Sequence, residues 1–448
     1  MQIKKLELQN FRCFEHLDMD FHCYDDGGGL TVLVAENGKG KTTVLDSISF
    51  ILGRFLLGFS NISNVPYIDK RHDMRTVWAR MGRTLRERKL LPARVALSMT
   101  NPCSQEEKTY AVEMTSLKIT RLLTRALRMA AQSLENDYSV KSLNVTFPLV
   151  AYYNTERAIV FNAPKRLSPN RKKAYSPLDA YDGALKGFLD FRRMVEWVAF
   201  QEDKERREMI RRRRFNHRTL EMHTIQTVIE CILPGFHNLH SEIGPRRLMI
   251  DYTTDNGTNR YQLDEELSDG QRVMLTLALD LTSRMLEANG ENCKTPQEVL
   301  NSPGIVLIDE IELHLHPSWQ QHVLIDLQKA FPKIQFVVTT HSPQVVSSVP
   351  RECLRILDGQ SARTPDEQTE GEGSQNILAN IFGTAPTPSL SHVPDIHHFA
   401  ALVAQGQGDT PKAEELLTRI KTHFGENYPM LSGILAQRDF LRSRNRRG

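Results

Sequence analysis

The 448-residue chain contains no apolar run near the roughly 18 residues that a membrane-spanning helix requires. Its N-terminus, Met1-Gln2-Ile3-Lys4-Lys5, continues with polar residues, so neither a signal peptide nor a transit peptide is readable. We therefore expect no membrane role and a cytoplasmic location.

Paired cysteines and a strong net charge are also missing. The six cysteines are scattered without paired spacing, which argues against a disulfide framework or a zinc site and is typical of reduced thiols. A formal net charge of +3 is too small to indicate nucleic-acid binding by itself, so local basic runs have to be weighed individually. No internal repeat with a regular period is found.

The length allows two or three domains and a large core. We predict an α/β head over 1–360, interrupted by a charged helical arm over 177–231. The stretch 361–394 begins with many Glu, Thr, Gly and Ser residues and is predicted as a linker. Residues 395–448 are predicted as a small helical tail.

A phosphate-binding loop is predicted at Ala35–Thr42. An apolar strand pattern at Leu30–Val34 precedes it, and apolar residues at helical spacing between Val44 and Leu52 follow it. Ala35 stands where a glycine is usual, but the glycines of the cradle are present. In such a loop, backbone amides converge on the β- and γ-phosphates, a lysine adds positive charge and a hydroxyl ligates Mg²⁺. The predicted nucleotide-binding residues are Asn37, Gly38, Lys39, Gly40, Lys41, Thr42 and Thr43.

Two carboxylates directly follow a second apolar strand pattern, Gly304–Ile308. Asp309 is predicted to hold Mg²⁺ or its water together with Thr42, and Glu310 is predicted to polarise the attacking water. His341 follows another strand pattern and is predicted to reach the γ-phosphate. Glu310 and His341 are therefore the predicted catalytic residues.

The order of these elements resembles that of ABC-type ATPase heads of the branch that includes the SMC and RecF proteins. Leu267–Arg272 is similar to the signature motif of that family, and Asn10-Phe11-Arg12 is similar to a family element near the nucleotide. The resemblance implies ATP and Mg²⁺ as cofactors and a homodimer that sandwiches ATP. It further implies that Arg12 contacts phosphate, and that the nucleotide of the opposite subunit is contacted by Ser268, Gly270 and Gln271.

Two features depart from the family. Asn154 stands where the family carries a glutamine that couples the metal to the arm, so that coupling is in question. The long coiled-coil insertion of SMC proteins is absent, since only about 225 residues separate the loop from the signature motif.

The stretch Glu310–Pro317, with Thr339–Pro343 downstream, resembles the PtuA ATPases of Septu and retron anti-phage systems and the ATPase part of overcoming-lysogenization-defect nucleases. Those nucleases carry an acidic C-terminal Toprim domain, whereas no Asp-x-Asp follows the predicted linker. The PtuA resemblance implies an ATP-hydrolysing subunit, forming dimers or higher oligomers, that controls an HNH nuclease on another chain. The alternatives are a RecF-like DNA repair ATPase and a non-hydrolysing ATP sensor.

The densest basic run lies in the predicted arm and includes Arg211–Arg214. Binding of DNA, RNA or a partner and a merely solvated arm are equal alternatives here, because nearby glutamates partly offset the charge. The same alternatives apply to a second basic cluster, formed by Lys165, Arg166, Arg171, Lys172 and Lys173.

Two further segments carry no chemical motif of their own. His314 and His316 lack zinc-ligand spacing, so no metal site is predicted there. The tail has apolar residues at helical spacing, and we expect it either to bind the nuclease partner or to pack on the head.

Overall fold

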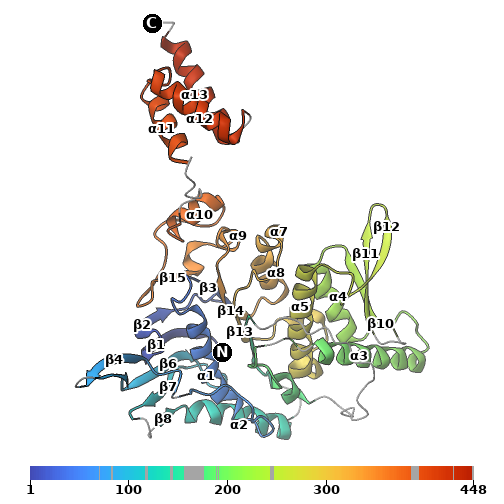
Figure 1. Cartoon of the computed structure of the whole chain (residues 1–448). Coiled ribbons are helices and arrows are strands. Elements are labelled where there is room, and N and C mark those ends of the chain that lie inside the picture. Colours follow the sequence, from blue (N-terminus) through green and yellow to red (C-terminus); the bar gives the residue numbers. More distant parts are fainter. Residues whose placement is uncertain are drawn as a thin grey trace. The chain divides into compact units, whose positions relative to one another are not determined.

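The computed structural model describes residues 1–69, 71–81, 84–116, 120–141, 145–155, 176–187, 189, 191–242, 247–384, 393–426 and 428–445. It divides into two compact units, Met1–Ile377 and Leu378–Gly448. Figure 1 shows the elements of both, and each unit is described by itself.

A six-stranded sheet runs through the first unit in the order β16-β15-β3-β14-β13-β9. Its strands pair in parallel, except for β16 at one edge. Four of them are buried along their whole length, as expected for strands covered on both faces. The strands are β3 (Gly29–Val34), β9 (Leu149–Tyr153), β13 (Gly304–Ile308), β14 (Ile334–Thr340), β15 (Leu354–Leu357) and β16 (Ala362–Arg363).

The register brings the predicted site segments to one edge of this sheet. Val34 pairs with Thr340, and Ile308 lies opposite Val338 on one side and Tyr153 on the other. The carboxyl ends of β3, β13 and β14 therefore meet, and the loops that follow them lie side by side. This edge is where open parallel sheets bind their ligands.

A second, antiparallel sheet has the order β2-β1-β6-β7-β8, and a separate hairpin is formed by β4 and β5. The long helix α1 (Lys41–Leu56) is buried around most of its circumference, and one hydrophobic core joins its side chains to those of both sheets. Helix α2 (Arg125–Lys141) packs on α1. The strands are β1 (Ile3–Phe11), β2 (Phe14–Asp20), β4 (Thr76–Met81), β5 (Thr84–Lys89), β6 (Ala93–Thr100), β7 (Glu107–Met114) and β8 (Thr120–Leu123).

Helices and a small sheet fill the rest of the first unit. Helix α4 contacts α5, α6 and α8, and α3 contacts α5 and the sheet β10-β11-β12. The elements are η1 (Pro177–Tyr181), α3 (Phe191–Arg212), α4 (Leu220–Ile232), β10 (Phe236–Glu242), β11 (Arg247–Thr254), β12 (Gly257–Gln262), α5 (Asp269–Asn289), η2 (Gly290–Asn292), α6 (Pro296–Leu300), α7 (Pro317–Gln320), α8 (Val323–Ala330), α9 (Pro343–Val346) and η3 (Arg351–Cys353), and the boundary between the two units falls within α10 (Ser374–Asn380).

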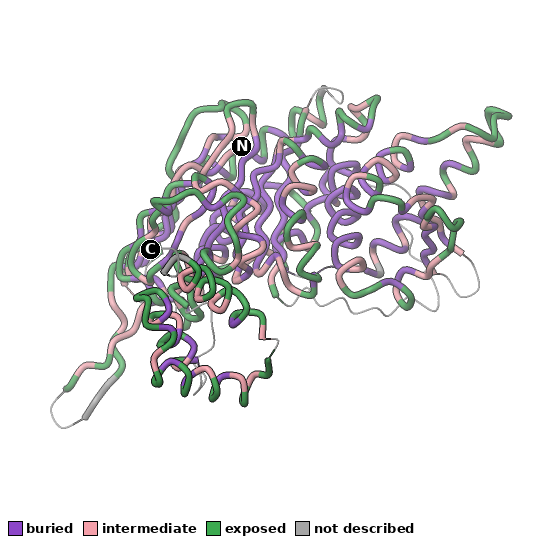
Figure 2. The backbone as a smooth tube through the Cα atoms, turned by 90° about the horizontal axis from the view of Figure 1, so that it is seen from above, coloured by how far each residue is buried: buried purple, intermediate pink, exposed green. Residues whose placement is uncertain are grey.

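The predicted arm is less independent of the head than its charge suggests. Val195, Trp197 and Val198 on the first half of α3 are buried, whereas the arginines at its end are exposed. The apolar residues of this amphipathic helix therefore anchor it to the head, and only its distal end projects into solvent. Figure 2 shows buried residues along the central strands and helices of the first unit and exposed ones at the end of the hairpin formed by β11 and β12.

The second unit is a three-helix bundle made of α11 (Val393–Ala404), α12 (Pro411–Phe424) and α13 (Pro429–Asn445). Its own core is formed by Ile396, Phe399, Val403, Ala413, Leu416, Ile420 and Leu431. The α/β head with a helical insertion and a small helical tail is thus confirmed as the fold class.

The first unit extends beyond residue 360, where the predicted linker begins. Thr369 is buried, and its hydroxyl donates to the carbonyl oxygen of Val349 at 2.8 Å. Gln344 Nε2 likewise donates to Ser374 Oγ at 2.8 Å. These hydrogen bonds hold residues up to about Ile377 on the first unit, although their composition is typical of a linker.

Candidate nucleotide-binding site

A pocket of about 440 Å³ opens at the carboxyl edge of the central sheet. The residues that line it come from the β1–β2 turn, the phosphate loop and the segments after β13 and β14. They are Arg12, Cys13, Asn37, Gly38, Gly40, Lys41, Thr42, Thr43, Asp309, Glu310 and His341. Ten of the predicted site residues thus lie around one cavity, although they are separated by up to about 330 residues in the chain.

The phosphate loop has the conformation that its glycines permit. Gly40 has a φ of 97° and precedes the first turn of α1, so the amides of that turn have no side-chain cap. Uncapped amides at a helix N-terminus attract anions. The loop and helix therefore have a geometry suited to an anion, and phosphate binding there stays a prediction.

Lys41 is folded back over the loop. Its Nζ donates to the carbonyl oxygens of Ala35 at 2.8 Å and Glu36 at 3.4 Å. Burial lowers the pKa of Lys41, and the nearby carboxylates of Asp309 and Glu310 oppose that shift. An anionic phosphate would provide a stronger acceptor than these carbonyls. Lys39 does not line the pocket, and its ammonium lies 3.9 Å from the carboxylate of Glu36.

The predicted metal ligands contact each other directly. The Thr42 hydroxyl donates to Asp309 Oδ2 at 2.8 Å, and the Thr339 hydroxyl donates to Asp309 Oδ1 at 2.5 Å. Asp309 is only 2% exposed, and its backbone N–H donates to the Tyr153 carbonyl oxygen at 2.8 Å. A hydroxyl and a carboxylate are oxygen ligands of the kind that Mg²⁺ prefers, so the residues present fit the ion.

Glu310 has a left-handed backbone conformation, with a φ of 48°. Its N–H donates to Thr339 Oγ1 at 2.7 Å, and the next N–H, of Ile311, donates to the Thr339 carbonyl oxygen at 3.0 Å. Strained backbone of this kind persists where surrounding contacts enforce it. Thr339 therefore orients both acidic residues, Asp309 through its side chain and Glu310 through its backbone.

His341 is positioned by a residue to which the sequence analysis assigned no role. Glu312 accepts hydrogen bonds from the backbone N–H of His341 at 2.6 Å and from the Thr340 hydroxyl at 2.8 Å. Burial, followed by the positive charge of Lys41, lowers the pKa of His341. A lowered pKa favours the neutral imidazole at physiological pH.

Arg12 lines the pocket, but carboxylates hold its guanidinium. Nε lies 2.8 Å from Asp73 Oδ1, and one terminal nitrogen lies 2.5 Å from Asp46 Oδ2. Asp46, on α1, also accepts a hydrogen bond from the Tyr152 hydroxyl at 2.9 Å. In this arrangement, Arg12 ties the β1–β2 turn to the helix that follows the phosphate loop.

The signature residues lie at the start of α5. Ser268 and Gln271 form a capping box, in which Ser268 N–H donates to Gln271 Oε1 at 3.0 Å. A Cβ on Gly270 would lie 3.2 Å from the His314 carbonyl oxygen. Within the described part of the chain, none of Ser268, Gly270 and Gln271 lines the pocket.

Asn154 and the two histidines also lie apart from the pocket lining. Asn154 N–H donates to the Gly187 carbonyl oxygen at 2.8 Å, and its side chain packs against Gly187. His316 caps α7, with Nδ1 2.9 Å from Ser318 Oγ. Among the residues that the structure describes, no group of three His, Cys, Asp or Glu side chains suits a metal ion.

At the end of α3, Arg211 and Arg212 pair with Glu208 at 3.1 and 2.9 Å. Phe215, just beyond them, is 83% exposed. The second basic cluster, residues 165–173, lies outside the described residues.

Among the described helices, we find none that combines the length and the apolar character needed to span a bilayer.

Sequence reasoning missed three positioning residues, Thr339, Glu312 and Asp46, and one lining residue, Cys13. Thr339 and Glu312 do lie within motifs that the sequence singles out, but their partners are set by how β13 and β14 pair. The feature of the sequence that pointed to Thr339 and Glu312 was that polar residues stand at the ends of buried strands.

Comparisons with known proteins agree with this geometry. A family model described as AAA domain matches residues 5–230, and a second AAA domain model, whose description refers to the AbiEii toxin of type IV TA systems, matches residues 125–347. Together these matches include the phosphate loop, the signature segment and the Asp309–Glu310 pair.

Three curated proteins are similar. "Retron Ec83 probable ATPase" of Escherichia coli is 26% identical, over 95% of this chain and 84% of that protein. "Retron Vc95 probable ATPase" of Vibrio cholerae serotype O1 biovar El Tor is 25% identical, over 95% of this chain and 88% of that protein. "Septu protein PtuA" of Bacillus mycoides (strain KBAB4) is 44% identical over 85 residues, which are 19% of this chain and 11% of that protein.

The resemblance to Septu and retron ATPases is therefore confirmed. The first family model spans 226 of the 448 residues, and the chain belongs to the AAA domain family of ATPases.

Proposed function

We propose that this chain binds ATP with Mg²⁺ in the pocket, hydrolyses it, and thereby controls an HNH nuclease on another chain during anti-phage defence. The observation that supports ATP hydrolysis most directly is the contact between Thr42 and Asp309. These residues are 267 positions apart, yet their side chains meet at 2.8 Å inside a pocket that also contains Lys41 and Glu310.

In this proposal the phosphates of ATP lie against the amides of the loop and the first turn of α1. Lys41 exchanges its carbonyl acceptors for phosphate oxygens, which raises its pKa because an anion replaces neutral dipoles. Thr42 and Asp309 would hold Mg²⁺, which supplies charge neutralisation on the β- and γ-phosphate oxygens.

Glu310 acts as the general base. It faces the pocket from the segment directly after Asp309, and its backbone is held by Thr339. It accepts a proton from the water that attacks the γ-phosphorus. Neutral His341 donates a hydrogen bond to a γ-phosphate oxygen, and Glu312 keeps its backbone in place.

A second copy of the chain completes the site. Ser268 is exposed at the N-terminus of α5 and does not line the pocket of its own chain. An exposed helix N-terminus can donate to a phosphate of a neighbouring subunit. We therefore propose that Ser268, Gly270 and Gln271 contact the nucleotide of the opposite subunit in a dimer that sandwiches ATP. Several such dimers can form a higher oligomer.

The defence role is supported by the two retron ATPases, which align over 95% of this chain, and by the shorter similarity to Septu PtuA. The HNH partner is proposed from the resemblance of Glu310–Pro317 to PtuA ATPases. The exposed segment Arg211–Phe215, which covers the last residues of α3 and those directly after it, is the surface that we propose for DNA or RNA.

Glu310→Gln tests the catalytic assignment. We expect ATP affinity to persist and turnover to fall on the order of 10²-fold or more, because the amide cannot accept the proton. ATP binding is measured by calorimetry and turnover by phosphate release. Lys41→Ala should instead lose ATP binding.

Glu36→Gln is the matched control for this experiment. Glu36 is exposed on the same loop and does not line the pocket, so turnover should stay unchanged. Undiminished turnover in Glu310→Gln would remove Glu310 from the mechanism. A wild-type chain that binds ATP without any hydrolysis would favour the sensor alternative.

A further inference from the structure

The hairpin formed by β4 and β5 is strongly basic. Between Thr76 and Lys89 the sequence has five arginine or lysine residues and one acidic residue, Glu87, which gives a net charge of +4, whereas the whole chain has a net charge of +3. Figure 1 shows β4 projecting from the side of the first unit. Within the described part of the chain, no residue of this hairpin lines the nucleotide pocket, so ATP binding does not account for its charge.

The base of the hairpin is fixed to the β1–β2 turn. Arg75 N–H donates to the Asn10 carbonyl oxygen at 3.0 Å, and Leu90 N–H donates to the Arg75 carbonyl oxygen at 2.9 Å. Phe11 and Met74 also form a β-bridge. The two strands therefore extend from a fixed base, and their regular antiparallel pairing determines which side chains share a face.

Trp78, in the middle of β4, is 70% exposed. A single exposed apolar side chain is common on protein surfaces and does not indicate a binding site by itself. Arg80, however, lies two residues further along the strand and therefore on the same face as Trp78. Arg88 lies opposite Val77 and therefore on the other face. Both arginines are exposed, and neither forms an ion pair with any residue that the structure describes.

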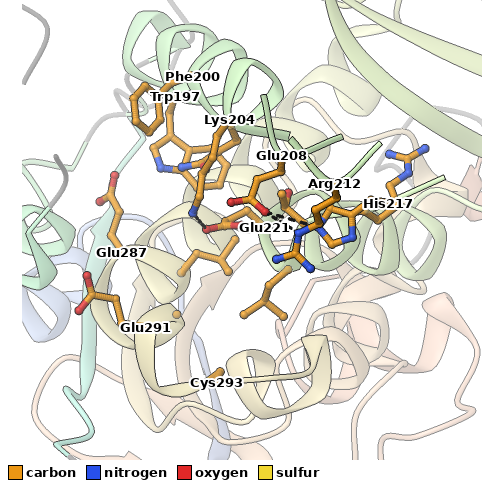
Figure 3. A pocket seen from close by; sticks show the side chains of 16 residues that line it. Trp197, Phe200, Lys204, Glu208, Arg212, His217, Glu221, Glu287, Glu291 and Cys293 are labelled. Atoms are coloured by element: carbon orange, nitrogen blue, oxygen red, sulfur yellow. Dashed lines mark hydrogen bonds and ion pairs between the residues drawn. The ribbon is translucent and has the colours of Figure 1, made fainter. Parts of the chain in front are cut away.

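Basic residues on the arm differ from these arginines because carboxylates neutralise them. Lys204 lies 2.5 Å from Glu221, and Arg212 lies 2.9 Å from Glu208, at a pocket between α3, α4 and α5. Figure 3 shows both pairs joined by dashed lines. An external anion would have to compete with these glutamates on the arm, whereas the exposed arginines of the hairpin can meet it directly.

We propose that the face of the β4–β5 hairpin that carries Trp78 and Arg80 binds a single strand of DNA or RNA. The bases of a single strand have free flat faces, which stack on aromatic side chains. Its phosphates attract cations such as the arginine guanidinium. Trp78 and Arg80 offer both contacts side by side, and single strands of DNA and RNA share the chemistry that these two residues recognise.

Other anionic partners fit this face less well. In a duplex, neighbouring base pairs cover the faces of the bases, so that Trp78 could contact only the outside of the helix. Carboxylates of an acidic protein segment would pair with Arg80 but would give the Trp78 ring no flat surface for stacking. The inference depends neither on ATP hydrolysis nor on the surface proposed at Arg211–Phe215.

Fluorescence anisotropy of the full chain with labelled oligonucleotides tests the proposal in the absence of ATP. The probes are a DNA strand, an RNA strand of the same sequence and the corresponding DNA duplex, each about 20 nucleotides long and thus longer than a site of roughly 4–16 nucleotides. We expect saturable binding of a single strand. Trp78→Ala should weaken it about tenfold because stacking is lost, and Trp78→Phe, which keeps an aromatic ring, should retain most of the affinity.

The salt dependence of binding tests the role of Arg80 separately. For a single strand, the slope of log K against log salt concentration changes by about 0.7 for each phosphate contact. Arg80→Gln should therefore make the slope shallower by about 0.7, whereas Trp78→Ala should lower the affinity and leave the slope unchanged. Arg88→Gln is the matched control, because Arg88 is exposed on the other face of the same hairpin, and it should leave the slope unchanged.

Phe215→Ala separates the hairpin from the surface at the end of the arm, where Phe215 is 83% exposed. Weaker binding in Phe215→Ala, together with unchanged binding in Trp78→Ala and Arg80→Gln, overturns the inference and assigns the strand to the arm. Absence of saturable strand binding overturns it too, as does a duplex that binds as tightly as the strand and is unaffected by Trp78→Ala. Binding of only the DNA strand or only the RNA strand supports the inference and identifies the ligand.

The melting temperature of each variant serves as the check on folding. Trp78 and Arg80 are exposed, so their substitution should leave the melting temperature unchanged. Loss of strand binding at an unchanged melting temperature supports direct contact. Equal losses in Trp78→Phe and Trp78→Ala would contradict the stacking role of the ring and overturn the inference.

Discussion

At the scale of single residues, two glycines of the phosphate loop share a left-handed backbone but differ in their surroundings. Gly40 has a φ of 97°, and a Cβ there would lie 2.4 Å from Phe14 Cζ and 2.7 Å from Cys13 Sγ. Gly38 has a φ of 78°, but a Cβ there would meet nothing within 4 Å among the described atoms. Both positions favour glycine because of their positive φ. At Gly40 a Cβ would in addition clash with Phe14 and Cys13, whereas at Gly38 it would meet no described atom.

We expect Gly40→Ala to abolish ATP binding, because the alanine Cβ would overlap the Phe14 ring and displace either that ring or the loop. Gly38→Ala should cost only the backbone strain of about 1–2 kcal/mol, and therefore roughly a tenfold loss of affinity. Calorimetric titration with ATP compares the two variants. Equal losses in both would show that contact with Phe14 does not matter.

At the scale of elements, α5 links the signature residues to the central sheet. Asp280, on this helix, accepts hydrogen bonds from the Tyr153 hydroxyl at 2.6 Å and from Arg284 Nε at 2.7 Å. The carbonyl oxygen of Tyr153 in turn accepts the backbone N–H of Asp309. The helix whose N-terminus we assign to the opposite nucleotide is therefore connected by hydrogen bonds to the strand beside the metal ligand.

The same helix carries a buried carboxyl group whose ionisation lowers the stability of the folded state. Burial raises the pKa of Glu287 to about 7 from 4.5, although Arg193 and Arg284 oppose the shift. The folded state therefore favours the protonated form. The resulting stabilisation is complete below pH 4.5 and is lost as pH rises to about 7.

Glu287→Gln should remove this part of the pH dependence. Between pH 4.5 and 7, the wild type should lose roughly 3 kcal/mol of stability relative to the variant. Thermal unfolding of both chains across that interval measures the difference. Parallel stability profiles would contradict the raised pKa.

At the scale of the whole molecule, mixing two inactive variants tests the ATP sandwich. Lys41→Ala disables the phosphate loop, and Ser268→Arg disables the signature segment. A mixed dimer has one intact composite site, so random mixing should restore at most about a quarter of wild-type turnover. Confirmed heterodimers without any recovered turnover would count against the sandwich.

The second unit is our proposed docking surface for the nuclease, since it has its own core and lies beyond the first unit in sequence. A chain truncated after Thr384 should keep ATP affinity but lose copurification of the nuclease expressed from the same operon. The full chain serves as the control. If the truncated chain retains the nuclease, docking must take place on the first unit.

The sequence by itself determined the phosphate loop, the Asp309–Glu310 pair and the order of elements around them. These are local patterns, in which strand, glycine turn and helix follow one another within about twenty residues. The sequence by itself also determined the three tail helices, because apolar residues at helical spacing indicate helices with one buried face. That spacing does not identify what the buried faces pack against.

Only the tertiary structure decided which side chains meet. Thr339 orients Asp309 and Glu310 because β14 pairs with β13, and the arm is anchored because the apolar residues on the first half of α3 pack on the head. Residues up to about Ile377 stay with the first unit through hydrogen bonds that composition does not reveal. Such contacts join residues far apart in the chain, and local patterns carry no information about which distant partner a side chain will find.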